Sequence, residues 1–428
     1  MELERAKGTR DFLPEEKILR DNIVSKIKEI FELYGYNPLE TPIIERYETL
    51  SSKYAGGAEI LKETFKLKDQ GKRQLGLRYD LTVPLARVIG MNPNLKLPFK
   101  RYQIGEVFRD GPLKTGRYRQ FTQCDVDVIG IKQMTADSEI LALTKNIFNK
   151  LNLDIVIKVN NRKLLNGILN QVKISKNKQE SIIISLDKIE KIGIEEVKKE
   201  LNKKGLDKKQ IEILIEKLIL EGTNKSKLSE IKIFIDNKEG EEGIKEIEEL
   251  LKYLEVLDTN VIFDLSLARG LSYYTGTVFE VYLKKGEVKS SLAAGGRYDK
   301  MISSFLNTTK EYPAVGISFG LDIILETIKL KKIEVKKSIV QVYIIPIKTL
   351  EDSLKIAQKL RDNGIKIDID LMERGVIKNL EYCNNLEIPY VIFIGKKELA
   401  IDKLKLRNMK TGNEEYLSID ELIKKLSN

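Results

Sequence analysis

The sequence predicts an α+β protein in which an antiparallel sheet with flanking helices is interrupted by a helical insertion and followed by a smaller α/β domain. Three stretches lead to this prediction. From Phe99 to Gly130, apolar and polar residues alternate on both sides of a Gly/Pro/Lys loop, which is typical of a long antiparallel hairpin. From about 160 to 257 the chain is rich in Lys, Glu, Ile and Asn and indicates several helices. From about 338, strand-like and helix-like segments alternate, which favours a partly parallel sheet.

Local signals predict the elements that precede the insertion. Pro14 and the acidic pair Glu15–Glu16 suit the first turn of a helix that carries an apolar stripe. A strand is expected over residues 73–79, and Thr82 is expected to cap a short helix. After the hairpin, an amphipathic helix is expected from Thr135 to Leu151.

Strands return after the insertion, and we expect them at Val261–Leu265, Thr277–Leu283 and Ser290–Ala294. A Gly-rich turn, Gly295-Gly296-Arg297, should follow, and then a final strand and helix between about 313 and 329.

The domain boundaries depend on one charged, Gly-free stretch, Lys329 to Lys337, which is predicted to be a linker. We therefore expect a first domain over 1–330 with its insertion at about 160–257, a linker over 331–337 and a second domain over 338–428.

In the second domain, strands are expected at Ile339–Ile345, Ile365–Leu371 and Pro389–Ile394. Thr349 is predicted to cap a helix that ends at Gly364. The segment from Ser418 to Glu421 has the pattern of a capping box for a final helix.

Composition limits the classes of function. The 74 basic and 64 acidic residues give a net charge of +10, which permits a polyanionic partner such as RNA without requiring one. The two cysteines have no metal-site or disulfide spacing, so we expect a reducing compartment and no protein-held metal. The amino terminus does not resemble a secretory signal, and no apolar run is long enough to cross a bilayer. These features predict a cytoplasmic protein that makes no membrane contact.

The chain contains no histidine. This excludes Ser-His-Asp and Cys-His catalysis, His-ligated zinc and any imidazole acid/base step by the protein itself. Catalysis must then depend on Arg, carboxylates, Tyr, a metal ion held by substrate phosphates, or the substrate.

The long hairpin carries the residues best suited to such chemistry. Arginines offer planar, paired donors that match phosphate, whereas nearby carboxylates suit a cationic or N–H-bearing substrate. The hairpin therefore predicts a site that joins a nucleotide to an amino compound. The arginines are Arg101, Arg109, Arg117 and Arg119, and the acceptors are Gln123, Asp125 and Asp127. We expect the Asp125 side chain on the opposite face of its strand from the site.

Several segments, in order, resemble a known family. They are GTRDFLPEE (8–16), ETPIIE (40–45), LRYDLTVPLAR (77–87), the hairpin, LARGLSYYTGTVFE (267–280), AAGGRYDKM (293–301) and PAVGISFGLD (313–322). Together they resemble the histidyl-tRNA synthetases, a family of class II aminoacyl-tRNA synthetases. The resemblance implies a class II catalytic sheet, a homodimer formed through the ETPIIE segment, and a carboxy-terminal anticodon-binding domain.

The resemblance also implies the reaction and the residues that bind histidine. Histidine and ATP would give histidyl-adenylate and pyrophosphate, and the histidyl group would then pass to the 3′ end of tRNA. Arg109 and Arg269 would be catalytic, on opposite sides of the α-phosphate. Asp80 and Thr82 would hold the α-ammonium group of histidine and Gln123 its backbone polar groups. Asp127 would accept a ring N–H, while Tyr274, with Tyr273 beside it, would meet the other ring nitrogen.

For ATP, the resemblance adds further residues. Arg117 would reach the β- or γ-phosphate, Phe121 would stack on adenine, and Gly295 and Gly296 would let the backbone approach the nucleotide closely. Mg²⁺ would be held mainly by the ATP phosphates.

Three positions depart from the family pattern. Ile323 stands where an arginine normally grips the γ-phosphate, and Gly111 stands where an acidic residue normally meets adenine, with Asp110 as a candidate substitute. Ser272 stands where Asp is usual. Two alternatives therefore stay open: a catalytically silent paralogue acting as the regulatory subunit of ATP phosphoribosyltransferase, and a nucleic-acid-binding module built on a decayed synthetase.

Overall fold

The computed structural model describes residues 3–51, 61–113, 118–269, 273–331 and 336–427, apart from the side chains of residues 190 and 191. These residues form two compact units. The first contains residues up to 10 and from 23 to 331, and the second contains residues 11–22 and those from 336 onward.

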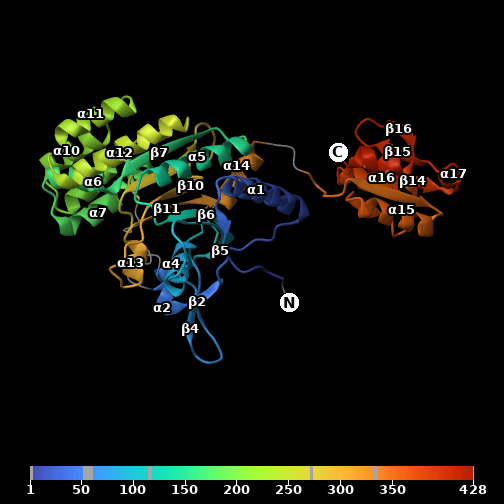
Figure 1. Ribbon diagram of the computed structural model, residues 1–428, viewed down its shortest axis with the longest axis horizontal. Coiled ribbons are helices and arrows are strands. Elements are labelled where there is room, and N and C mark those ends of the chain that lie inside the picture. Colours follow the sequence, from blue (N-terminus) through green and yellow to red (C-terminus); the bar gives the residue numbers. More distant parts are fainter. Residues whose placement is uncertain (1–2, 52–60, 114–117, 270–272, 332–335, 428) are drawn as a thin grey trace. The chain divides into compact units, whose positions relative to one another are not determined.

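The first unit is built on an eight-stranded sheet with the strand order β1-β5-β6-β11-β10-β9-β7-β8 (Figure 1). The six central strands run antiparallel, and a two-residue strand pairs in parallel at each edge. The predicted hairpin is confirmed as β5 and β6. The strands are β1 (Asn37–Pro38), β5 (Phe99–Phe108), β6 (Gln120–Ile129), β7 (Ile155–Asn161), β8 (Ile262–Phe263), β9 (Thr277–Leu283), β10 (Ala293–Arg297) and β11 (Ala314–Gly320).

One face of this sheet is apolar and packs against residues 23–33 of helix α1 (Pro14–Leu33) and against α5 (Thr135–Lys150). The Phe319 ring on β11 lies 5.8 Å from the Phe31 ring of α1 and 5.9 Å from the Phe148 ring of α5, centroid to centroid. Because side chains alternate along a strand, the residues next to Phe319 point to the other face. α14 (Leu321–Leu330) follows β11 directly.

The second face of the sheet is polar near its centre and meets a smaller layer. A second sheet, in the order β2-β4-β3, and short helices make up this layer, with a core that joins Tyr79 and Val83 to Tyr298 and Met301. The elements are β2 (Ile44–Arg46), α2 (Tyr47–Leu50), β3 (Lys66–Lys68), β4 (Gln74–Leu77), α4 (Thr82–Met91) and α13 (Met301–Phe305).

The predicted insertion is helical and lies between β7 and β8, green to yellow in Figure 1. Its first and last helices cross closely because glycines form the contact: a Cβ atom on Gly167 would lie 2.3 Å from the Gly240 Cα atom. The helices are α6 (Arg162–Gln171), α7 (Lys176–Leu186), α8 (Ile189–Ile192), α9 (Ile194–Lys203), α10 (Lys208–Leu218), α11 (Asn224–Phe234) and α12 (Lys238–Val256).

The second unit contains a five-stranded sheet in the order β13-β12-β14-β15-β16, in which the first three strands are parallel. The predicted capping box is confirmed, since Ser418 and Glu421 bond each other's backbone N–H at the start of α18. The β15–β16 hairpin is absent from the sequence prediction. The elements are β12 (Val342–Ile347), α15 (Leu350–Asp362), β13 (Ile367–Ile369), α16 (Val376–Asn385), β14 (Tyr390–Gly395), α17 (Lys396–Ala400), β15 (Leu404–Asn408), β16 (Glu414–Leu417) and α18 (Ile419–Leu426).

Three local predictions are wrong. Thr349 precedes α15, but its hydroxyl donates to the Ile394 carbonyl and does not cap the helix. The residues expected as a Gly-rich turn form β10, where a Cβ atom on Gly295 would lie 2.1 Å from the Gly316 carbonyl oxygen, so glycine here permits close strand packing. Thr82 does not cap α4. Instead, the Asp80 carboxylate accepts a hydrogen bond from the Val83 N–H at 3.0 Å.

None of the helices in the described part of the chain is long and apolar enough to span a bilayer.

Candidate active site

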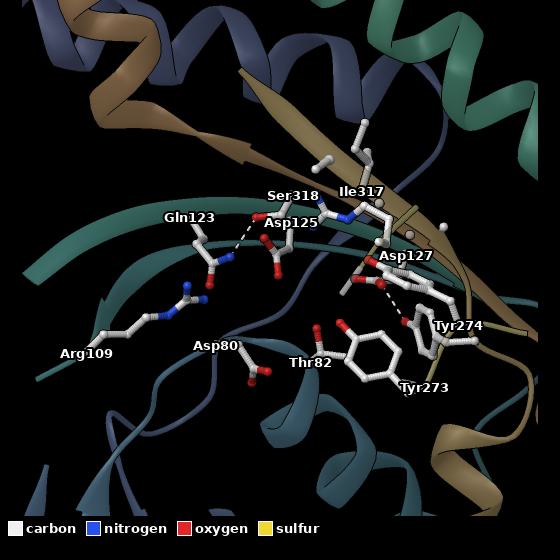
Figure 2. Close-up of a pocket in the computed structure, with 16 residues that line it drawn as sticks. Asp80, Thr82, Arg109, Gln123, Asp125, Asp127, Tyr273, Tyr274, Ile317 and Ser318 are labelled. Carbon is white, nitrogen blue, oxygen red and sulfur yellow. Dashed lines mark hydrogen bonds between the residues drawn. The ribbon is translucent and has the colours of Figure 1, made fainter. Parts of the chain in front are cut away.

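A cavity of about 220 Å³ opens on the polar face of the large sheet (Figure 2). Strands β6, β10 and β11 form one side, and the start of α4 and the segment around Tyr273 form the other (Figure 2). It is lined by Asp80, Thr82, Arg109, Gln123, Asp125, Asp127, Arg269, Tyr273, Tyr274, Ala294, Gly295, Gly296, Tyr298, Gly316, Ile317 and Ser318.

All eight residues predicted to bind histidine therefore line one cavity, together with Gly295 and Gly296. Phe121 is not among the lining residues, and Arg117 lies outside the described residues. The sequence prediction missed Asp125, Tyr298 and Ser318.

Asp80 is positioned by the first turn of α4, where its carboxylate accepts the Val83 N–H. Burial raises the pKa of Asp80 to about 6, and the hydrogen bond from Val83 opposes this rise. Above that pH the side chain is a carboxylate facing the cavity, which is the group that an ammonium ion requires.

Asp127 is already engaged within the protein. Its Oδ1 atom accepts a hydrogen bond from the Tyr298 hydroxyl, and its Oδ2 atom forms an ion pair with Arg101 Nη2 at 2.8 Å. Arg101 is fully buried and also donates to the Leu81 carbonyl at 3.3 Å. Burial raises the pKa of Asp127, while Arg101 and the Tyr298 hydroxyl oppose that rise.

The prediction for Asp125 is wrong: its side chain lies on the same face as Asp127 and lines the cavity. Residues two apart on a strand share a face, so the spacing itself was the signal. In the sheet, Asp125 lies opposite Gln103 of β5 and Ser318 of β11. Burial raises the pKa of Asp125 to about 7, with Arg101 opposing this rise.

Arg109 stands at the other end of the cavity (Figure 2). Its Nε atom donates to the Tyr79 carbonyl at 3.1 Å, and its guanidinium carbon lies 5.1 Å from the centroid of the Phe121 ring. The backbone and the aromatic ring fix the arginine, while its terminal nitrogens face the cavity that a phosphate group could enter.

Arg269 is held by a buried acid that the sequence prediction did not single out. Its Nη1 atom donates to Glu280 on β9, and the other Glu280 oxygen accepts from the Tyr282 hydroxyl. The rings of Tyr273 and Tyr274 lie beside it with their centroids 4.8 Å apart. Glu280 therefore fixes the direction in which the Arg269 guanidinium points.

Gly111 and Ile323, two of the positions that depart from the family pattern, lie next to charged side chains. A Cβ atom on Gly111 would lie 2.8 Å from the Glu63 carboxylate, and Asp110 is paired with Arg119 at 3.1 Å. Ile323 is half-buried on α14, where the adjacent Asp322 binds Arg10 at 2.6 Å. Ser272 lies outside the described residues.

Comparisons with known proteins show the family to which the chain belongs. A family model described as histidyl-tRNA synthetase matches residues 8–324, and one described as anticodon binding domain matches residues 341–428. A protein named histidine–tRNA ligase 1 from Bacillus cereus is 45% identical over 425 residues, which cover 99% of this chain and 97% of the relative.

Solved structures give the same result. A histidyl-tRNA synthetase from Nostoc sp. PCC 7120 superposes with a TM-score of 0.89 at 31% identity, over 100% of this chain and 99% of the other. A Bacillus halodurans protein described as an ATP phosphoribosyltransferase regulatory subunit/histidyl-tRNA synthetase has a TM-score of 0.77 at 26% identity, over 92% of this chain and 98% of the other.

Proposed function

The chain belongs to the histidyl-tRNA synthetase family, and we propose that it is a histidine–tRNA ligase, which activates L-histidine with ATP and transfers the histidyl group to the 3′ end of its tRNA. The single observation that carries the proposal is the cavity, which joins Asp80, Thr82 and Gln123 to Arg109 and Arg269. Acceptors for an amino acid and donors for a phosphate thus lie within one enclosed space.

In the activation step, the carboxylate of histidine attacks the α-phosphate of ATP and pyrophosphate leaves. Negative charge builds up on the phosphate oxygens, and Arg109 and Arg269 are the cations that stabilise it. Each is held before substrate arrives, Arg109 by the Tyr79 carbonyl and Arg269 by Glu280, so little reorganisation is needed.

Histidine is oriented by the other residues that line the cavity, which form its amino-acid end. Asp80 and Thr82 take the α-ammonium group, and Gln123 offers an Oε1 atom that has no hydrogen-bond partner among the described residues. The tyrosines and the carboxylates of β6 surround the imidazole ring. Analogues that lack the ring N–H groups are rejected because buried acceptors would be left unpaired.

Mg²⁺ is assigned mainly to the ATP phosphates. Asp127 is not a suitable ligand for it, because Arg101 is already paired with that carboxylate. When bound, the ion supplies charge neutralisation on the phosphates. Adenine binds near Phe121, and Arg117 binds the β- or γ-phosphate.

In the transfer step the protein has no imidazole to act as base, since it contains no histidine. We assign the base to a phosphate oxygen of the adenylate. Transfer that proceeds equally well from an adenylate analogue lacking that oxygen would contradict this assignment.

We further propose a cytoplasmic, class II homodimer that binds tRNA through its carboxy-terminal domain. The ETPIIE segment leads into β2, and its Ile43 and Ile44 are 42% and 52% exposed in the single chain. Exposed isoleucines of this kind support a subunit contact. Analytical ultracentrifugation tests it, with dimer expected for the natural chain and dissociation for Ile44→Glu.

The regulatory-subunit alternative is weaker. The relative named as a histidine–tRNA ligase covers 99% of this chain at 45% identity, whereas the structure whose description includes a regulatory subunit is 26% identical. The carboxy-terminal match to an anticodon binding domain also favours the ligase.

The experiment is ATP–pyrophosphate exchange with each of the twenty amino acids in turn. Exchange with histidine alone supports the proposal. Histidine binding without exchange, measured by calorimetry, would move the assignment to the regulatory subunit.

A further inference from the structure

The amino-acid end of the cavity contains an unusual group of buried charges. Arg101, Asp125 and Asp127 are 0%, 4% and 4% exposed, respectively. Arg101 lies opposite Asp127 in the sheet, and their side chains form an ion pair. Among the described residues, Arg101 Nε, Arg101 Nη1, Asp125 Oδ1 and Asp127 Oδ2 have no hydrogen-bond partner, although Asp127 Oδ2 is ion-paired with Arg101 Nη2 at 2.8 Å. Buried polar atoms are normally paired, so these atoms indicate a polar ligand or water next to them.

Asp125 is the carboxylate that keeps an oxygen available. Both oxygens of Asp127 are engaged, by Tyr298 and Arg101. By contrast, Asp125 is hydrogen-bonded to Ser318, which itself accepts a hydrogen bond from Gln123 at 2.8 Å, and its Oδ1 atom stays unpaired. Gln123 and Ser318 thus orient Asp125 and leave one acceptor directed at a ligand.

The charges at this end of the cavity do not balance. Asp80, Asp125 and Asp127 supply three negative charges, and Arg101 supplies one positive charge. Of the remaining arginines, Arg269 is paired with Glu280, and Arg109, which also faces Asp80, stands at the end assigned to phosphate, where it offsets the α-carboxylate of histidine. The charged and polar groups that face Asp125 are Arg101 and Gln103 of β5, Gln123 and Asp127 of β6, Ser318 of β11, and Asp80 before α4. With all three carboxylates ionised, two negative charges are left over.

Histidine with a protonated ring carries two positive groups, the α-ammonium and the imidazolium. We propose that Asp125 is a specificity-determining residue that makes this cavity bind histidine with its imidazole ring protonated. The inference rests on the proposed function, because histidine must be the ligand of the cavity. The ring takes its proton from solvent at a nitrogen lone pair, and both ring nitrogens then donate hydrogen bonds.

This charge balance predicts how many protons are taken up when histidine binds. A histidine ring ordinarily loses its proton near pH 6.5, so at pH 8 free histidine arrives with a neutral ring. At that pH the Asp125 carboxylate is ionised, because its pKa is about 7. Binding at pH 8 therefore takes up about one proton, since the two cationic groups of the ligand complement the carboxylates.

The test is titration calorimetry of histidine binding at pH 8 in buffers with different ionisation enthalpies. The natural protein is expected to take up about one proton per histidine. Asp125→Asn, which keeps the side-chain shape, is expected to take up almost none and to bind histidine about tenfold more weakly. Asp154→Asn, at an exposed carboxylate outside the cavity, is the matched control and should behave like the natural protein.

A second ligand separates this inference from the proposed function. Triazolylalanine has a ring that stays neutral at pH 8, so its affinity should hardly change in Asp125→Asn. Binding of histidine by the natural protein without proton uptake would overturn the inference, even if histidine-dependent exchange is robust. Equal losses for both ligands in Asp125→Asn would also overturn it. The proton count on the natural protein needs no variant, so it stands even if Asp125→Asn fails to fold.

Discussion

The two ends of the cavity are built in different ways. At the amino-acid end, neighbouring strands place Asp125 and Asp127 in register with Ser318 and Gly316, so the sheet itself fixes the side chains. The two arginines assigned to phosphate lie outside the strands, Arg109 after β5 and Arg269 before β9, and each depends on a partner group for its direction. In the proposed function, strand register therefore sets the recognition of histidine, whereas the partners of two arginines set the chemistry of activation.

The largest effect is expected at the arginines assigned to phosphate. Arg269→Ala should lower histidine-dependent ATP–pyrophosphate exchange by at least about 100-fold, because a preorganised donor to the developing charge is lost. Histidine binding, measured by calorimetry without ATP, should change much less. A parallel loss of binding would show that the two ends are not separate.

A smaller loss is expected when the partner of Arg269 is changed. Glu280→Gln keeps a side chain of similar shape but removes the charge that holds the guanidinium. It should lower kcat for exchange about tenfold and leave the KM for histidine nearly unchanged. Glu280→Asp should restore part of the rate. If KM rises while kcat stays constant, Glu280 does not act through Arg269.

Packing between the strands behind the cavity supports the amino-acid end. Gly295→Ala would place a methyl group 2.1 Å from the Gly316 carbonyl and should destabilise the protein by about 2 kcal/mol. Gly71→Ala is the matched control, because the nearest side-chain atom would lie 3.4 Å away. Urea unfolding of both variants measures the difference. Equal midpoints would show that the strands adjust freely.

The smallest effect is expected for Asp125→Asn, which should raise the thermal stability of the protein. Without histidine, Asp125 has a pKa of about 7 in the folded protein, against about 3.9 when unfolded. The folded state therefore holds more protons between these values, and its free energy of unfolding falls as the pH rises through this window. Asp125→Asn removes that loss, so its Tm should exceed that of the natural protein at pH 8. The difference should shrink toward pH 4, and a difference independent of pH would contradict the assigned cause.

The same contrast explains how much the sequence could predict. The alternation from Phe99 to Gly130 is local, and it predicted β5 and β6, the second of which carries Gln123 and Asp127 into the cavity lining. The same two-residue period, applied strictly, would also have placed Asp125 in the cavity. The capping box at Ser418 is equally local and was predicted correctly.

Features that depend on distant parts of the chain could not be predicted in this way. Gly295 suggests a turn when read alone, and only the approach of β11 explains it as a strand glycine. The engagement of Asp127 by Tyr298 joins residues far apart in the sequence. The pairing of Arg269 with Glu280 joins a residue outside the strands to a residue of β9.

The most direct test of the central claim is the charging of tRNA. Purified protein, ATP, Mg²⁺, labelled histidine and a histidine-accepting tRNA should give histidyl-tRNA, and Arg269→Ala should give almost none. If histidine binds but no label reaches the tRNA, the cavity recognises the amino acid without activating it, and the ligase assignment is wrong.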